Sequence, residues 1–385
     1  MKRGHYVEVW CPDTADRSYL PLSKLATEHV LPLKEDLRKV NQRRKTHNFK
    51  WMYQRVNAVK NHCLRCAEQI GRGRFDVLLA NSCGILHISH VGAFLEIPKV
   101  IYLGEPSRML YEARPTLPWV APQPSGRPWY AWNEVKKKIN DAWVIHQLRV
   151  RAREEVSAAK SYDTILVNSR FSRENVLRVY GLESKVCYLG VDTNLFQPKG
   201  ENRRPFVVGM GMMGYNKGVD RAIRAVAAMP QQKRPSLVWI ANSIDKVYEK
   251  RMRHLAGSSQ VDFVLKYSLG DHEVMGLLSG AAAFIYTPRL EPFGLAPLEA
   301  NACETAVVGI SEGGLRESIE EGVNGFLIDD DNPQELAKAA MAFTEDLAYA
   351  SEMGKKAREY VVNNWSLHSA QERIEGFLLR AIDDN

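Results

Sequence analysis

The sequence predicts an α/β protein built from two Rossmann-like domains. Apolar, β-branched runs alternate with amphipathic stretches along the whole chain, which is the pattern of parallel βα units. A polar segment rich in proline, glycine and charge, QPKGENRRP at 197–205, separates these runs into two groups. The length of 385 residues is enough for two full hydrophobic cores.

Each group of apolar runs supplies the strands of one predicted domain. The first group covers residues 6–10, 77–80, 99–103, 164–167 and 186–188. The second covers residues 206–209, 236–240, 261–265, 283–286, 306–308 and 325–328. A helical pattern at 366–381 follows the last strand and predicts a helix that crosses back onto the first domain. We therefore predict a first domain at 1–199, a second at 200–365 and a crossing helix within 366–385.

The opening of the chain departs from this scheme. A doubly wound domain normally begins with its central strand, whose glycine-rich turn faces the ligand. Here KRGHYVEVWCPD resembles the end of a first helix followed by a second strand. We expect the first βα unit to be missing, so that neighbouring strands of the first sheet expose unpaired backbone groups.

Composition excludes several protein classes. With 45% hydrophobic and 25% charged residues, and no apolar run of about 18 residues, the chain is neither disordered nor membrane-spanning. Six scattered cysteines indicate reduced thiols in the cytoplasm. Cys63 and Cys66 form a C-x-x-C without a second pair at zinc spacing, so we interpret them as helix cysteines. The net charge of +7 indicates an anionic partner without identifying it.

A glycine-rich turn follows the first strand of the second domain. Gly209 to Gly214 reads GMGMMG, which fits the dinucleotide pattern G-x-G-x-x-G. That pattern also requires an acidic residue after the next strand, but LVWI is followed by Ala241, Asn242 and Ser243. Instead, Lys217 and Gly218 come just before the next helix, and a lysine beside a glycine turn suits a bound diphosphate.

The most informative segment is TPRLEPFGLAPLEANACETAVVG. An apolar strand runs into a loop with Glu291 and Gly294, and a short helix with Glu299 follows. Free backbone N–H groups at the start of that helix can hold an anionic diphosphate. Carboxylates beside a phosphate need hydroxyl donors, and sugar and ribose hydroxyls would supply them.

This segment resembles a known family. EPFGLAPLE, from Glu291 to Glu299, is similar to the E-x7-E motif of the retaining GT-B glycosyltransferases of family 4, the glycosyl transferases group 1. Further similar segments, in chain order, are IYLGEPSRMLYE, TILVNSRFSRENVLRVYG, VCYLGVDTNLF, VVGMGMMGYNKGVD and EGGLRESIEEGVNGFLIDDDNPQELAKA. The resemblance implies the GT-B fold, with two Rossmann-like domains facing a central cleft, and the use of a nucleotide sugar.

The resemblance also implies roles for individual residues. Glu299 would bind the ribose, Glu291 would meet the sugar, and Lys217 would neutralise the diphosphate leaving group. Lys217 and Glu291 are the expected catalytic residues. The remaining donor-site positions are Gly211, Met212, Phe293, Gly294, Leu295 and Ala296. No metal or other cofactor is expected, and Asp329 to Asp331 are interpreted as an acidic turn before a helix.

The acceptor side is assigned to the first domain. The expected residues there are His87, His90, Glu105 and Arg108. The chain departs from the family at Met212, where the family has an arginine, and at Gly104, where one subgroup has a histidine. Tryptophans and a tyrosine between proline-rich turns either stack on acceptor sugars or are structural; they are Trp119, Trp129, Tyr130, Trp132 and Trp143.

These observations predict a retaining hexosyltransferase that uses a nucleoside diphosphate sugar, with UDP-glucose as the representative donor, for polysaccharide biosynthesis. The acceptor would be a glycan, a lipid-linked saccharide or a polysaccharide. The alternatives are a catalytically impaired sugar-nucleotide-binding partner protein and an epimerase or hydrolase of the same fold. The basic, aromatic stretch 34–65 is either a contact with an anionic membrane, on its cytoplasmic face, or a solvated helix face. No nucleic-acid partner is expected.

Overall fold

The computed structural model describes residues 3–18, 21–42, 49–113, 116–121, 123, 126, 128, 130–329 and 332–384. Trp129, Asp330, Asp331 and positions 43–48 of the predicted basic stretch lie outside these residues. The chain forms two compact units. Unit 1 comprises Met1–Leu166, Val176–Lys185 and Phe377–Asn385, and unit 2 comprises Val167–Asn175 and Val186–Gly376.

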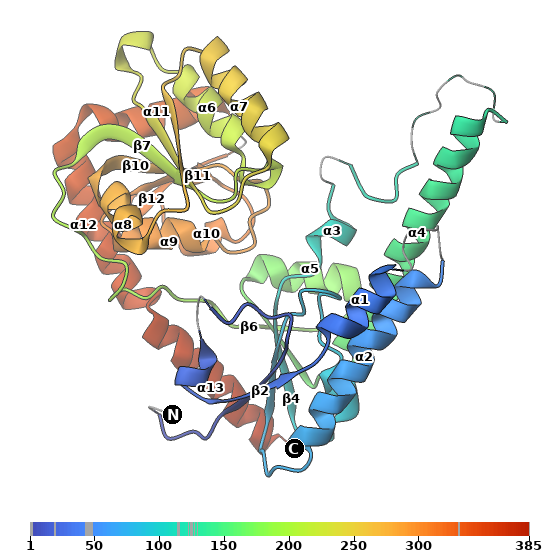
Figure 1. Ribbon diagram of the computed structural model, residues 1–385. Helices are drawn as coiled ribbons and strands as arrows, with labels where there is room; N and C mark the ends of the chain where they lie inside the picture. Colours follow the sequence, from blue (N-terminus) through green and yellow to red (C-terminus); the bar gives the residue numbers. More distant parts are fainter. Residues whose placement is uncertain are drawn as a thin grey trace. The chain divides into compact units, whose positions relative to one another are not determined.

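Unit 2 is built on a six-stranded parallel sheet (Figure 1). Its strands are β7 (Arg204–Met210), β8 (Leu237–Ala241), β9 (Phe263–Tyr267), β10 (Ala281–Tyr286), β11 (Val307–Ile310) and β12 (Gly325–Ile328). They lie in the order β12-β11-β10-β7-β8-β9, the order of a doubly wound Rossmann sheet. The predicted α/β class with parallel sheets is therefore confirmed.

Helices cover both faces of this sheet, which explains why its central strands are continuous apolar runs. Every residue of β8, β10 and β11 is buried. One face packs against α6 (Val219–Ala227), α7 (Lys246–Ser258), α11 (Pro333–Glu345) and α12 (Leu347–Asn364). The other packs against α8 (Asp271–Gly280), α9 (Leu295–Ala302) and α10 (Leu315–Ser318).

Unit 1 contains a four-stranded sheet in the order β3-β4-β5-β6. Its strands are β3 (Leu78–Asn81), β4 (Lys99–Gly104), β5 (Thr164–Val167) and β6 (Lys185–Val186). The helices before and between these strands are α1 (Lys34–Gln42), α2 (Trp51–Ile70), α3 (Arg108–Tyr111), α4 (Trp132–Ala159) and α5 (Arg170–Tyr180). The last helix, α13 (Leu367–Asp383), begins in unit 2, and its residues from Phe377 onward cluster with unit 1.

The first two strands form a sheet of their own. β1 (Glu8–Pro12) pairs in parallel with β2 (Thr27–Leu31), from Glu8 opposite Thr27 to Pro12 opposite Leu31. The strand predicted at 6–10 is thus β1, displaced by two residues, and β2 was not predicted. In the described residues β1 hydrogen-bonds within this pair and not within the four-stranded sheet. The missing first βα unit stays a prediction.

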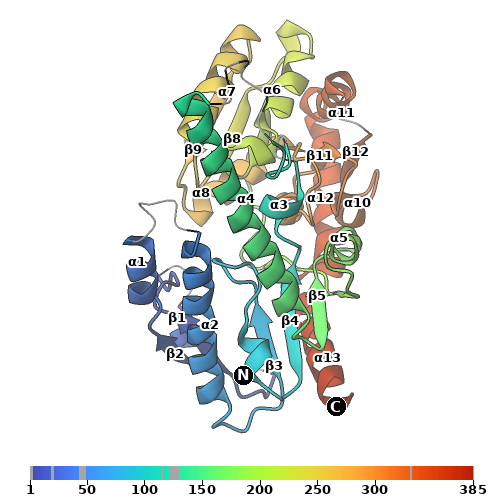
Figure 2. The same cartoon turned by 90° about the vertical axis from the view of Figure 1, so that its right-hand side faces the viewer.

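The predicted basic, aromatic stretch is two helices rather than one. Asp13 caps the first of them, because its Oδ1 accepts hydrogen bonds from the N–H groups of Leu33 and Lys34 at 2.7 and 2.8 Å. The second, α2, buries an apolar face that includes Trp51, Met52 and Val56, and it packs along α4 (Figure 2). Within the described parts of the chain, no helix combines the length and apolar character needed to cross a membrane.

Candidate functional site

The sheet order of unit 2 locates a ligand site before any side chain is considered. The chain winds from β7 to β8 and β9 on one side and to β10, β11 and β12 on the other. In such sheets ligands bind beyond the carboxyl ends of the strands where the winding direction changes. That place lies between the loops that follow β7 and β10. These loops contain the two motifs singled out in the sequence.

The loop after β7 is fixed to the end of β8 by hydrogen bonds. The N–H of Gly211 donates to the carbonyl of Ile240 at 2.9 Å, and its own carbonyl accepts from Trp239 Nε1 at 3.0 Å. The N–H of Met213, a fully buried residue, donates to Ser243 at 2.8 Å. Gly211 has a φ of 147°, and a Cβ there would lie 3.1 Å from Cγ of Lys217. The lysine side chain therefore passes directly over this glycine.

Lys217 and Glu291 meet at the ligand end of the sheet. Nζ of Lys217 lies 3.0 Å from Oε2 of Glu291 and 6.0 Å from the ring centroid of Tyr286. The two charged side chains are 27% and 12% exposed, respectively. The two predicted catalytic residues are thus adjacent and partly exposed, and their side chains form an ion pair.

The loop that carries Glu291 rests on a second glycine turn. The N–H of Gly314 donates to the carbonyl of Glu291 at 2.8 Å. A Cβ at Gly313 would collide with that carbonyl, and one at Gly314 would collide with the carbonyl of Pro292. Leu290 has a φ of 51°, a strained value for a non-glycine residue, and its N–H donates to Glu312 at 3.2 Å. This close packing fixes the backbone position of Glu291.

Helix α9 begins without a side-chain cap. Gly294, at the N-cap, has a φ of 91° and offers no side chain to the first N–H groups of the helix. Leu295 is 37% exposed and Ala296 is partly exposed. An anionic group can therefore approach these backbone donors. The ring of Phe293 is buried against Trp365, so this residue can contribute only backbone groups to the site.

Glu299 lies on α9, five residues beyond its N-cap. Burial raises the pKa of its carboxyl group to about 7. A carboxyl group with that pKa is partly charged at neutral pH, and hydroxyl donors would stabilise the charged form. Glu299 is thus suited to accept hydrogen bonds from a ligand with hydroxyl groups.

Gly218 and Thr287 join the two loops, a role that the sequence did not predict for either residue. Oγ1 of the buried Thr287 donates to the carbonyl of Gly218 at 2.8 Å. Gly218 has a φ of 66°, and a Cβ there would collide with the carbonyl oxygen of Thr287. A polar residue at the end of an otherwise apolar strand was the available signal for this contact.

Three of the predicted acceptor residues lie together in unit 1. His87 has a φ of 70°, and its Nε2 lies 2.7 Å from the carbonyl oxygen of Glu105. Nε of Arg108 is 2.6 Å from Glu112 and 3.8 Å from Glu105. These residues follow β3 and β4, at the carboxyl ends where a parallel sheet binds ligands.

His90 does not fit its predicted placement in a cleft. His90 is 2% exposed, and its Nε2 lies 3.4 Å from the buried carboxylate of Glu154. Lys60 approaches the same carboxylate at 2.6 Å. Burial lowers the pKa of the His90 imidazole, which favours the neutral ring. We therefore assign His90 to the interior of unit 1 and not to the acceptor side.

The cysteines and acidic residues form no metal site within the described residues, where no group of three or more candidate ligands comes together. Cys63 and Cys66 are buried free thiols on α2, as predicted. Burial raises the pKa of Cys66 to about 12, so its reactive thiolate form is rare at neutral pH.

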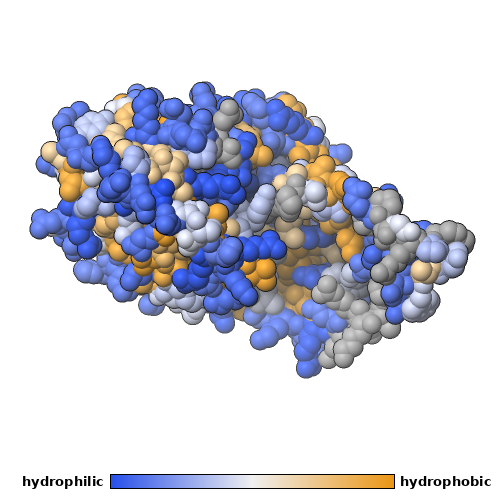
Figure 3. All heavy atoms as spheres, turned by 90° about the horizontal axis from the view of Figure 1, so that it is seen from above, coloured by the Kyte–Doolittle hydropathy of each residue, from blue (hydrophilic) through white to orange (hydrophobic). Residues whose placement is uncertain are grey.

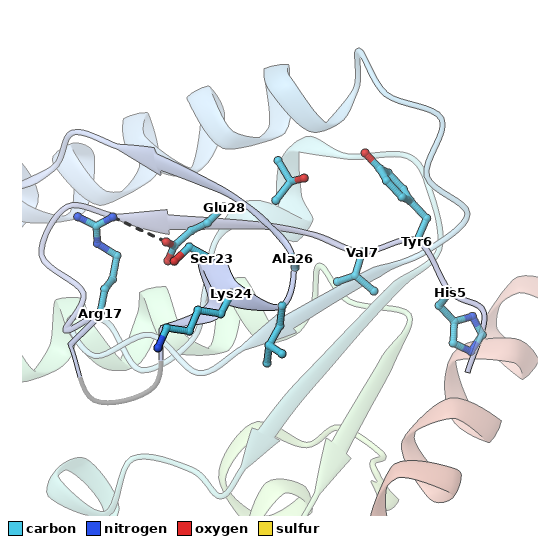
Figure 4. Close-up of a pocket in the computed structure, with 10 residues that line it drawn as sticks. His5, Tyr6, Val7, Arg17, Ser23, Lys24, Ala26 and Glu28 are labelled. Carbon is cyan, nitrogen blue, oxygen red and sulfur yellow. Dashed lines mark ion pairs between the residues drawn. The ribbon is translucent and has the colours of Figure 1, made fainter. Parts of the chain in front are cut away.

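Two further surface features are formed by other residues. A cavity of about 690 Å³ is lined by residues 5–7, 17 and 23–28 (Figure 4). These residues lie around the amino-terminal ends of β1 and β2, the opposite end from that used by ligands in parallel sheets. On the face of unit 2 visible in Figure 3, hydrophilic side chains predominate and apolar ones are dispersed, as on an ordinary domain surface.

The segment that contains this site matches a known protein family. Residues 191–360 match the family described as Glycosyl transferases group 1. The matched segment contains the loops after β7 and β10 and all of α9. The matched segment thus includes every residue of the predicted donor site.

Curated relatives of this chain are named as enzymes that act on sugars. α-Maltose-1-phosphate synthase of Mycolicibacterium smegmatis is 28% identical over 248 residues, which cover 57% of this chain and 64% of that protein. Human α-1,3/1,6-mannosyltransferase ALG2 is 24% identical over 249 residues, covering 57% of this chain and 59% of that protein. The chain thus spans about three fifths of the length of these relatives.

Solved structures establish the fold. Anabaena HepE in complex with UDP and glucose superimposes with a TM-score of 0.67 and 18% identity, covering 97% of this chain and 99% of that one. Sucrose-phosphate synthase from Thermosynechococcus elongatus gives a TM-score of 0.63 and 18% identity, covering 88% and 79%. These similarities confirm the predicted GT-B fold of two Rossmann-like domains.

Proposed function

We propose that this protein is a retaining glycosyltransferase that moves a hexose from a nucleoside diphosphate sugar to a saccharide acceptor. The observation that supports this most directly is the Lys217–Glu291 pair, 3.0 Å apart in the glycosyl transferases group 1 domain. A cation suited to a diphosphate and a carboxylate suited to sugar hydroxyls therefore lie side by side. The uncapped start of α9 adds backbone donors for the diphosphate.

In the proposed mechanism, binding of the donor breaks this ion pair and gives each of its two side chains a new partner. Lys217 would turn from Glu291 to the diphosphate, and Glu291 would then accept hydrogen bonds from the sugar. The bond between the anomeric carbon and the diphosphate oxygen breaks, and the acceptor oxygen bonds to the same face of that carbon. The acceptor hydroxyl proton passes to the departing diphosphate. Lys217 and α9 stabilise the charge that develops on this leaving group, without requiring a metal.

We propose UDP as the nucleotide, because HepE, of the same fold, is described in complex with UDP and glucose. Names among the relatives include mannosyltransferases, so GDP-mannose is the appropriate competitor. The acceptor class is a glycan, a lipid-linked saccharide or a polysaccharide. We propose action in the cytoplasm, at the inner face of the membrane; all six cysteines are free thiols, which suits a reducing compartment.

A two-stage assay tests this proposal. Thermal shift with UDP-glucose, other UDP-sugars and GDP-mannose identifies the donor, because a ligand that binds only the native state raises its stability. Nucleotide release is then measured with and without acceptor saccharides. Release that depends on acceptor supports the transferase. Nucleotide release without acceptor indicates a hydrolase. Donor binding without nucleotide release indicates a sugar-nucleotide-binding protein. Met212, at the position where the family has an arginine, favours that last alternative.

Lys217→Ala tests the leaving-group role. Removing a preorganised cation should lower turnover by about 10- to 1,000-fold. Lys266→Ala, at an exposed lysine on β9 of the same unit, is the matched control and should leave turnover unchanged. Steady-state kinetics of both variants provide the measurement. Equal turnover in Lys217→Ala and the control would contradict the assignment.

Glu291→Ala separates sugar recognition from nucleotide recognition. It removes the carboxylate that pairs with Lys217 but no group assigned to the nucleotide. We expect weaker UDP-glucose binding and undiminished UDP binding, both measured by calorimetry. Glu299→Ala, which affects the ribose, should weaken both ligands by roughly 1.5–3 kcal/mol. Parallel loss of UDP affinity in the two variants would show that their roles are not distinct.

A further inference from the structure

The first half of α4 carries side chains that the fold of unit 1 does not bury. The buried residues of this 28-residue helix begin at Gln147. None of residues 132–146 is buried, and the ring contact between Trp143 and Trp51 of α2 falls near the end of that stretch. At 1.5 Å per residue, the segment from Trp132 to Gln147 is about 22 Å long. Figure 1 shows this half extending away from the rest of unit 1.

Large apolar side chains are exposed at the amino-terminal end of this helix. Three of them are strongly exposed: Tyr130 at 69%, Trp132 at 68% and Ile139 at 46%. We call these three residues the α4 tip. Trp132 and Ile139 are seven residues apart, about two helical turns, so they lie on one face of α4. Isolated exposed apolar residues are common, but several large ones on one projecting helix end indicate an interaction surface.

Positive charge accompanies the α4 tip. Residues 130–139 include three lysines and one glutamate. Nζ of Lys136 lies 5.1 Å from the ring centroid of Trp132, and Lys137 pairs with Glu134 at 3.3 Å. The partner must therefore offer both apolar contact and negative charge.

We propose that the α4 tip inserts into the interface of an anionic lipid bilayer. Tryptophan and tyrosine rings favour the boundary between headgroups and acyl chains, and neighbouring lysines attract anionic headgroups while their stems cover apolar surface. A projecting helix end suits a broad, deformable lipid surface. This surface shares no residue with the donor site.

This membrane contact lies on α4 and not on the stretch 34–65, where the sequence predicted it. In the stretch 34–65, Trp51 and Met52 are buried in unit 1. Lys60 pairs with Glu154, and Arg65 donates to the carbonyl of Pro32 at 2.7 Å. Phe49 and Tyr53 contact the ring of His146 on α4, and at 43% and 38% they are less exposed than Tyr130 and Trp132. The α4 tip keeps its aromatic side chains at the surface, beside lysines.

Sedimentation of the full chain with vesicles tests this inference. We compare vesicles of phosphatidylcholine with vesicles of equal parts phosphatidylcholine and phosphatidylglycerol. Binding should favour the anionic vesicles and weaken between about 0.1 M and about 0.5 M salt. Tyr130→Ala with Trp132→Ala, and separately Lys136→Gln with Lys137→Gln, should each reduce partitioning at least about tenfold. Tyr267→Ala with Lys266→Gln, an exposed aromatic and cationic pair in unit 2, is the matched control.

The possible outcomes separate the candidate occupants. Quenching of the tryptophan fluorescence by brominated lipids, reduced in Trp132→Phe, would support insertion. Loss of binding in Arg38→Gln with Lys39→Gln alone would return the contact to α1 and overturn the proposal. Concentration-dependent dimers that the tip variants abolish would identify a second copy as the partner and also overturn it. UDP-glucose binding, measured in parallel, should be unchanged in every tip variant, which shows that the donor domain remains folded.

Discussion

Glu299 shows how burial of a single carboxyl group can prepare it for a ligand. Its pKa of about 7 reflects the loss of solvation on burial. Ribose hydroxyls would restore hydrogen bonds and lower that pKa, so a proton would leave as the donor binds. The same group therefore links nucleotide recognition to pH.

This linkage predicts pH-dependent donor binding. The binding form is the carboxylate, so affinity should fall as pH falls below about 7. Between pH 8 and pH 6, the affinity for UDP-glucose should drop about tenfold. UDP-glucose rather than UDP is the ligand for this measurement, because the terminal phosphate of UDP itself titrates near pH 6. Calorimetry at several pH values provides the measurement.

Glu299→Gln serves as the control for this prediction. The amide keeps the size of the side chain but cannot titrate, so its UDP-glucose affinity should be weaker and nearly constant from pH 6 to pH 8. A tenfold pH dependence that persists in Glu299→Gln would assign the titration to another group. His87→Gln, in unit 1, should leave the pH dependence of donor binding unchanged.

At the scale of single residues, the sequence indicated the charged residues of the candidate site and missed those that support them. Lys217, Glu291 and Glu299 were predicted from charge placed beside glycine turns. The roles of Glu312, which holds Leu290, and of Thr287 depend on contacts between distant loops. No local pattern specifies such contacts. For the same reason, burial of His90 emerged only from the fold.

The turn before α6 shows how secondary-structure elements are joined at the site. Gly218 adopts a left-handed φ of 66° and lies against the backbone of Thr287, so the loops after β7 and β10 approach closely. Lys217 immediately precedes this glycine. The position of the lysine therefore depends on the absence of a side chain at the next residue.

Gly218→Ala should consequently damage both stability and donor binding. The new Cβ collides with the Thr287 carbonyl, in addition to about 1–2 kcal/mol for the left-handed backbone. Gly322→Ala isolates the backbone cost, since Gly322 has a φ of 73° and open space around its Cβ position. We expect Gly322→Ala to lose about 1–2 kcal/mol and keep UDP-glucose binding. Urea unfolding and calorimetry measure the two effects; equal losses in both variants would show that the close contact is unimportant.

Most elements were predictable because their patterns are strong and local. The strands predicted at 164–167 and 325–328 match β5 and β12. β2 was missed because the first three residues of TEHVL are all polar and the strand lacks a continuous apolar run. The stretch 34–65 was read as one helix face, but the structure has two helices, α1 and α2, with different surroundings.

At the scale of the whole molecule, the two units differ in how completely their sheets are covered. Unit 2 has one sheet with buried central strands and a core on each face. In unit 1, β1 contains no buried residue, and β2 contains one, Leu31. Side-chain contacts, including Trp10 against Phe75 and Gln69, hold the β1–β2 pair to its surroundings. The pair therefore has less packing to stabilise it than the sheet of unit 2.

This difference predicts the order in which the molecule opens. A two-stranded sheet is only marginally stable by itself, so amides of β1 and β2 should exchange through local unfolding. Amides of β10 and β11 lie in fully buried strands and should exchange only when unit 2 unfolds. Native-state hydrogen exchange should show protection at least about 100-fold lower in β1–β2, a difference of about 3 kcal/mol. The sheet β3–β6 is the internal comparison, because weak protection there as well would indicate that unit 1 opens as a whole. Equal protection of β1 and β10 would mean that contacts such as that of Trp10 make the pair an integral part of a cooperative unit.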